Sequence, residues 1–156
     1  MVAQNFAHVR TWVFDLDNTL YPPSARLFDQ IEVRMTDWVA ETLGLAHPEA
    51  DALRRHYWRT YGTTLAGLMD EHGVDPDPYL HHVHEISLDH LSPEPALTRA
   101  IQRLPGRRIV YTNGSAPYAR RVIAARGLDG LFDAVYGVEH AGFRPKPERA
   151  AFEAVF

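Results

Sequence analysis

The amino-acid sequence predicts an α/β fold, in which a small parallel sheet carries a helical subdomain inserted after its first strand. Short β-branched and aromatic runs, each followed by a polar turn, predict strands at 11–13, 107–111 and 134–136. Helical stretches alternate with the last two strands, which favours parallel pairing with right-handed crossovers. Between the first two strands, about eighty residues show helical patterns and no convincing strand, which is too long for an ordinary connecting loop.

The first strand leads into the segment FDLDNTLY, residues 14–21, which is the most informative part of the chain. Side chains two apart on an extended strand point to the same side, so Asp15 and Asp17 are expected to present two carboxylates at one place. That place is the carboxyl end of the strand, where ligands bind in open α/β sheets. Because two like charges this close repel each other, a cation or a shared proton is expected between them.

The helical subdomain is predicted over residues 22–92, so that residues 1–21 and 93–156 form the α/β core. Its first helix follows two prolines and ends before Gly44, which suits the left-handed position after a helix. Glycine and proline separate the helices that follow, which are predicted over 48–61, 64–72 and 78–91. The first helix has apolar residues at helical spacing, namely Leu27, Ile31, Met35, Trp38, Val39 and Leu43.

The core resumes with a helix over 96–104, the second strand, a polar turn and a helix over 117–126. The turn is Thr112-Asn113-Gly114-Ser115, in which Ser115 suits the N-cap of the following helix. Free N–H groups at such a helix start attract anions. Asn-Gly is also typical of a β-hairpin turn, an alternative that the helical pattern after it disfavours.

The last predicted helix begins at Glu148 and runs to the final residue, Phe156. It carries apolar side chains but has no glycine, proline or cationic last turn that would end it. Three strands are also few for an open α/β sheet. We therefore interpret the sequence as cut in mid-element, with a core that is incomplete at its C-terminus.

Composition limits the classes of function. The chain has 156 residues, is 46% hydrophobic and carries a net charge of −4, with Lys and Arg spread along its length. This disfavours a nucleic-acid groove or an anionic membrane partner. The chain lacks cysteine, which excludes thiolate catalysis, and has neither a signal-peptide pattern nor an apolar run of about 20 residues. We expect a soluble cytoplasmic protein.

Three motifs resemble the signatures of the haloacid dehalogenase superfamily of phosphohydrolases. They are FDLDNTLY, Thr112 after the second strand, and Lys146 within RPKP, and they follow the family's order. The stretches DNTLYPPS, TNGSAPYARRV and GFRPKP most resemble the pyrimidine 5′-nucleotidase branch. The resemblance implies a Rossmann-like core, with residues 22–92 as the helical cap that such enzymes carry.

The resemblance also implies roles for five residues. Asp15 would be the nucleophile that forms an aspartyl phosphate, and Asp17 the general acid and base. Thr112, Asn113 and Lys146 would bind the substrate phosphate, and the Lys146 ammonium would also offset the negative charge of Asp15 and of the transferring group. Mg²⁺ is the implied cofactor, held by a carboxylate oxygen of Asp15 and the backbone carbonyl of Asp17.

We expect the protein to be a Mg²⁺-dependent phosphomonoesterase that hydrolyses pyrimidine 5′-nucleotides. Its expected partner is therefore a small-molecule phosphate ester. One alternative is a phosphatase for another small ester, such as a sugar phosphate or phosphoglycolate. Another is a truncated, inactive remnant that only binds phosphate. The family completes its metal site with an acidic loop after the lysine, but only ten residues follow Lys146, and neither Glu148 nor Glu153 is assigned to that role.

Other residue clusters have a structural and a functional interpretation. The histidines of residues 81–90 could bind a metal, but in a helical region we expect them to be solvated or capping. The aromatic residues Trp38, Tyr57, Trp58 and Tyr61 could stack on a base, and we expect them in the core instead. We expect an exposed position, on one face of a helix, for Arg54, Arg55 and Arg59.

Overall fold

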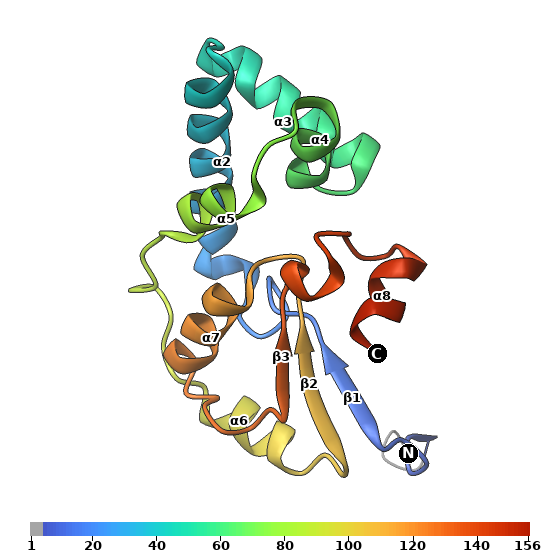
Figure 1. The fold of residues 1–156 in the computed structure, drawn as a ribbon. Helices are drawn as coiled ribbons and strands as arrows, with labels where there is room; N and C mark the ends of the chain where they lie inside the picture. The colour runs from blue at the N-terminus through green and yellow to red at the C-terminus, as the bar shows by residue number, and fades with distance from the viewer. Residues whose placement is uncertain (1–4) are drawn as a thin grey trace.

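The computed structural model describes residues 5–156 and contains a three-stranded parallel sheet (Figure 1). Its strands are β1 (Thr11–Phe14), β2 (Arg107–Tyr111) and β3 (Ala134–Tyr136), in the order β1-β2-β3. Phe14 lies opposite Val110, and Tyr111 opposite Tyr136. The carboxyl ends of all three strands therefore meet at one edge of the sheet, which faces the inserted helices. The predicted α/β class and the parallel pairing are confirmed.

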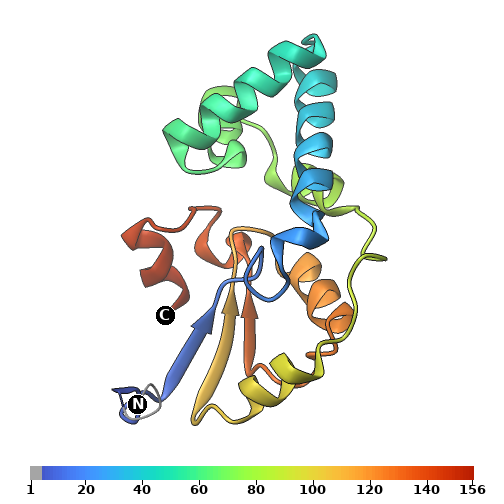
Figure 2. The ribbon, with the colours of Figure 1, turned by 180° about the vertical axis from the view of Figure 1, so that it is seen from behind.

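The segment between β1 and β2 begins with a helical insertion, the cap. Its helices follow the short 3-10 helix η1 (Pro23–Ala25) and are α2 (Leu27–Leu43), α3 (His47–Tyr61), α4 (Thr64–His72) and α5 (Pro76–His84). Helix α2 packs against α3 and α5, and α3 against α4. Figures 1 and 2 show these helices beyond the carboxyl edge of the sheet. The boundaries at residues 22 and 92 stay a prediction.

In the part of the chain that is described, no helix is both long and apolar enough to cross a membrane.

The predicted helix over 78–91 is wrong in its second half, because α5 ends at His84. Residues after it follow an irregular path, in which side chains from elsewhere bind part of the backbone. Gln30 donates to the carbonyl of Ser87 at 3.1 Å and accepts from its N–H at 3.2 Å. Arg121 donates to the carbonyls of His84 and Ile86, both at 3.0 Å. Backbone groups satisfied in this way do not need helical partners.

Helices cover both faces of the sheet. Helices α6 (Pro95–Gln102) and α7 (Ala116–Ala125) lie on one face, and η2 (Val138–Ala141) with α8 (Arg149–Val155) on the other (Figures 1 and 2). Successive residues of β2 alternate between the faces. Val110 joins the main hydrophobic core, whereas Tyr111 packs with α8 and donates a hydrogen bond to the carbonyl of Ala151. The helix after the polar turn, rather than a hairpin, is confirmed.

Candidate active site

The two predicted carboxylates lie on the turn after β1. The strand ends at Phe14, so Asp15 and Asp17 are presented by a turn and not by the strand itself. Asn18 has a φ of 56°, in the left-handed region that asparagine tolerates better than most residues. The N–H of Leu20 closes the turn on the carbonyl of Leu16 at 2.9 Å. The two side chains line one cavity, as predicted, but they are brought together by this turn and not by the alternation of side chains along a strand.

Lys146 is paired with Asp15 across the sheet edge. Its Nζ donates to Asp15 Oδ1 at 2.9 Å and to the Tyr111 carbonyl at 2.6 Å. The side chain of Asn113 holds the backbone of Lys146 at both ends, since Oδ1 accepts from the Lys146 N–H at 2.7 Å and Nδ2 donates to its carbonyl at 3.3 Å. Asn113 thus positions the lysine. Its expected contact with phosphate stays a prediction.

Asp17 is in a different environment from Asp15. The hydroxyls of Tyr21 and Tyr118 both donate to its Oδ1, at 2.7 and 2.9 Å. Burial raises the pKa of Asp17, and the two tyrosine hydrogen bonds counteract only part of that effect. A carboxyl group with a raised pKa is protonated over a wider range of pH. Asp17 is therefore suited to donate a proton, as expected of a general acid.

The polar turn after β2 forms the start of α7. Thr112 is fully buried, and its Oγ1 accepts from the N–H of Gly114 at 2.9 Å. Ser115 is the N-cap, as predicted. The helix start is less free than expected, because the Ala116 N–H donates to the carboxylate of Glu139 at 2.8 Å. The donors that remain for an anion include the hydroxyl proton of Thr112 and the third proton of the Lys146 ammonium.

All five predicted site residues line one cavity of about 410 Å³ between the sheet edge and the cap. They are Asp15, Asp17, Thr112, Asn113 and Lys146. The convergence that the sequence predicted is present in the structure, while their chemical roles stay predictions. The volume is typical of pockets that bind small molecules.

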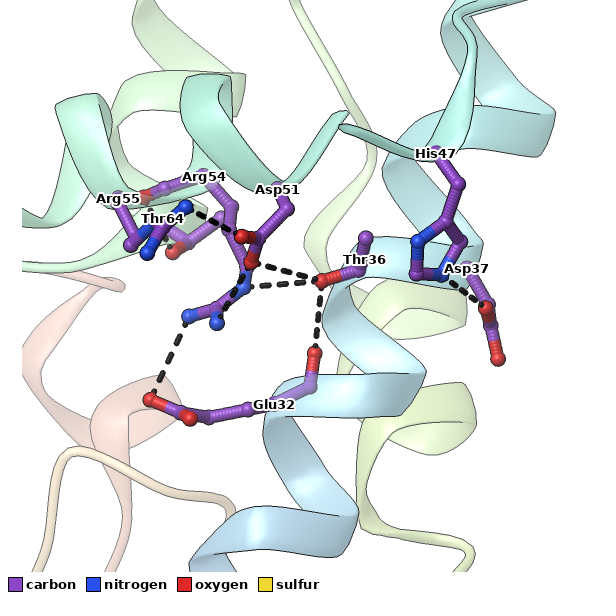
Figure 3. A network of polar contacts seen from close by, with 8 residues as sticks. All are labelled: Glu32, Thr36, Asp37, His47, Asp51, Arg54, Arg55 and Thr64. Carbon is purple, nitrogen blue, oxygen red and sulfur yellow. Dashed lines mark hydrogen bonds and ion pairs between the residues drawn. The ribbon is translucent and has the colours of Figure 1, made fainter. Parts of the chain in front are cut away.

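The cap forms the opposite wall of this cavity. Arg54 lines it and was wrongly predicted to be exposed, because its side chain is only 11% accessible. It donates to Thr36 at 2.9 Å and pairs with Glu32 at 3.4 Å, both on α2, which ties α3 to α2 (Figure 3). Trp58 also differs from the expectation, since this cavity-lining side chain is 61% exposed. Tyr57 is in the core, as predicted.

The match to known families agrees with this geometry. The family model of haloacid dehalogenase-like hydrolases matches residues 9–156, from the first strand to the last helix. The chain belongs to this family. The match covers the turn after β1, the turn after β2 and the lysine segment, which are the three regions that converge on the cavity.

Two proteins resemble this haloacid dehalogenase-like hydrolase. Phosphate metabolism protein 8 of Saccharomyces cerevisiae is 25% identical over 136 residues, which are 81% of this chain and 42% of the yeast protein. The chain thus spans about two-fifths of the length of that relative. The solved structure of the HAD-hydrolase YfnB from Bacillus subtilis, bound to magnesium, is 19% identical with a TM-score of 0.50. The alignment covers 94% of this chain and 71% of YfnB. This likeness shows a shared fold.

The residues around Asp15 and Asp17 are compatible with a Mg²⁺ ion. Carboxylate and carbonyl oxygens are the ligands that this hard cation prefers. The carboxylate of Asp15 faces the cavity, whereas Oδ1 of Asp17 is engaged by two tyrosines, which agrees with a role for its backbone carbonyl instead. Within residues 5–156 no group of three or more His, Cys, Asp or Glu side chains could hold a metal. One or two carboxylates suffice where substrate phosphate and water supply the other ligands.

Sequence reasoning missed two residues that contact Asp17 and a third that packs on one of them. Tyr21 lies inside FDLDNTLY, and its spacing of four residues from Asp17 was a signal that could have been used. Tyr118 lies in the first turn of α7 and reaches Asp17 across 101 residues of sequence. His84 was expected to be solvated or capping, but it is buried and stacked on Tyr118. Nothing in the local sequence indicates either of these two contacts.

Proposed function

We propose that the chain is a Mg²⁺-dependent phosphomonoesterase that acts through an aspartyl phosphate on pyrimidine 5′-nucleotides. The observation that carries the proposal is the Asp15–Lys146 pair, 2.9 Å apart, in one cavity with Asp17 and Thr112. A nucleophile, a cation beside it and a separate acid are the groups that this chemistry needs. Membership of the haloacid dehalogenase-like hydrolases and the phosphate-metabolism name of the yeast relative support the same class of reaction.

In the first step, a carboxylate oxygen of Asp15 attacks phosphorus, and the bond to the ester oxygen breaks. Because Lys146 contacts Oδ1, we assign the attack to Oδ2. Asp17 gives its proton to the departing alkoxide, so the alcohol leaves neutral. The hydroxyl of Thr112 and the ammonium of Lys146 donate to the phosphoryl oxygens, whose charge they offset.

In the second step, Asp17 takes a proton from water, and the water oxygen attacks phosphorus. The bond between phosphorus and Asp15 breaks, which releases inorganic phosphate and regenerates both carboxyl groups. Bound Mg²⁺ would supply positive charge to the phosphate oxygens and to the Asp15 carboxylate. The cap would exclude water and select the leaving group.

Three features support a nucleoside as the leaving group. The segments around the site residues most resemble the pyrimidine 5′-nucleotidase branch. The cavity extends from the carboxylates to the cap helices, which leaves space for more than a phosphate. Trp58 presents an exposed indole to this cavity, and aromatic rings stack well on nucleobases.

Phosphate release from a panel of esters with Mg²⁺ tests the proposal. The panel contains pyrimidine and purine 5′-monophosphates, sugar phosphates and phosphoglycolate. We expect the highest kcat/KM for the pyrimidine nucleotides, and no release by Asp15→Asn although the variant stays folded. Equal rates across the panel would reject the nucleotide preference, and near-normal turnover by Asp15→Asn would reject the nucleophile. Mg²⁺ binding without turnover of any ester would instead support the inactive remnant.

A further inference from the structure

The last residue of the cap helix α5 packs directly on the core helix α7. His84, which ends α5, is only 7% exposed. Its ring stacks on that of Tyr118, with 4.3 Å between ring centroids and 5° between planes. Its Nδ1 lies 3.1 Å from Oγ of Ser115, the N-cap of α7. Arg121, one turn further along α7, binds the carbonyl of His84 at 3.0 Å. The side chain and the backbone of His84 are therefore both attached to α7.

Tyr118 continues this set of contacts to the active site. Its hydroxyl donates to Asp17 Oδ1 at 2.9 Å. Both rings lie close over Gly114, since a Cβ placed there would lie 3.3 Å from both Tyr118 Cδ1 and His84 Nε2. Two contacts thus connect the end of α5 to the Asp17 carboxyl group. The first is the stack of His84 on Tyr118, and the second is the hydrogen bond from Tyr118 to Asp17.

We propose that His84 and Tyr118 are positioning residues, through which the connection between cap and core sets the orientation of the Asp17 carboxyl group. The inference rests on the proposed function, in which Asp17 is the proton donor. The hydroxyls of Tyr118 and Tyr21 hold Oδ1, which leaves Oδ2 to carry the proton for the leaving oxygen. A displacement of the cap that carries the His84 ring would also move Tyr118, and with it Asp17.

The test compares two esters that differ in their need for a proton donor. Alkyl phosphates expel a basic alkoxide and need the acid, whereas p-nitrophenyl phosphate expels a stable phenolate and does not. The kcat/KM value is compared because it reports the first phosphoryl transfer. We expect Tyr118→Phe to lower kcat/KM for the alkyl ester about tenfold, the value of one hydrogen bond to a charged group. His84→Ala, which removes the stack on Tyr118, should lower it in the same direction. Both variants should change kcat/KM for p-nitrophenyl phosphate much less. His84→Phe keeps a ring for the stack and should restore most of the loss.

His81, an exposed residue on the same helix, is the matched control, and His81→Ala should leave both esters unchanged. Equal losses on both esters, or no rescue by His84→Phe, would show a merely structural role and overturn the inference. NMR gives a readout that does not depend on turnover. At one fixed pH, the resonances of Asp17 should shift in His84→Ala and stay near wild-type positions in His84→Phe and His81→Ala. Unmoved Asp17 resonances in His84→Ala would overturn the positioning role, whereas wild-type protein that hydrolyses neither ester would reject only the proposed function.

Discussion

The buried His84 should make the protein less stable in mild acid. Burial lowers the pKa of His84 to about 4, from a usual value near 6.5 in the unfolded chain. The folded state therefore binds fewer protons than the unfolded state between these two values, so the free energy of unfolding falls as the pH drops through this window. Between pH 7 and pH 5 the expected loss from this one group is about 2 kcal/mol.

Urea unfolding at pH 7 and pH 5 measures this loss, with His84→Phe as the comparison. The variant keeps an aromatic ring on Tyr118 but cannot be protonated. The difference in unfolding free energy between the two pH values should be smaller in His84→Phe by about 2 kcal/mol. His81→Ala, which removes an exposed histidine of the same helix, should behave like the wild type.

Equal pH dependence in the wild type and His84→Phe would refute the reasoning. It would mean that His84 is protonated in the folded state without cost. Such a result would require a carboxylate or a water path at the ring. Arg121 is the charged side chain that binds the backbone of His84. Its positive charge lowers the pKa of His84 further, because it disfavours a second cation beside it.

Further outcomes concern the site and the connections of the cap. Lys146→Met should lower kcat by roughly 10²–10³-fold without unfolding the chain, because a cation beside the reacting phosphate is lost; unchanged kcat would contradict its assigned role. Asn113→Ala should reduce kcat roughly tenfold or more by releasing the Lys146 backbone, and a larger effect on KM than on kcat would indicate direct substrate binding instead. Buried Arg126 donates to the carbonyls of Leu20 and Ser92, so Arg126→Met should lower the unfolding free energy by about 3 kcal/mol in urea titrations, and a loss below ~1 kcal/mol would contradict it. Chelation of Mg²⁺ should abolish phosphate release and re-addition should restore it, whereas full activity in chelator would exclude the metal.

The parts of the fold that depend on local sequence were predictable. Strands such as Arg107–Tyr111 are short β-branched and aromatic runs that end at polar turns, and their pairing follows from the helices between them. Caps are equally local, and Ser115 and Gly44 occupy the expected positions. The meeting of the site residues was also predictable, because parallel strands end at the same edge of the sheet.

The failures arise where distant side chains replace local backbone partners. Residues after His84 have a sequence compatible with helix, but Gln30 and Arg121 bind some of their backbone groups in a non-helical path. Arg54 is similar, since only the packing of α3 on α2 brings Thr36 to its guanidinium. Neither interaction can be recognised from spacing, because the partners come from other elements of the fold.

The clearest example is the difference between Asp15 and Asp17. In sequence these are two equivalent carboxylates in one motif. In the structure, Asp15 is half exposed, and its Oδ1 is paired with the Lys146 ammonium at 2.9 Å. Asp17 is partly buried against Tyr21 and Tyr118, and this burial raises its pKa, which favours the protonated form that an acid needs. A motif can therefore place two acids together, but the separation of their chemical roles depends on residues that only tertiary packing brings to each of them.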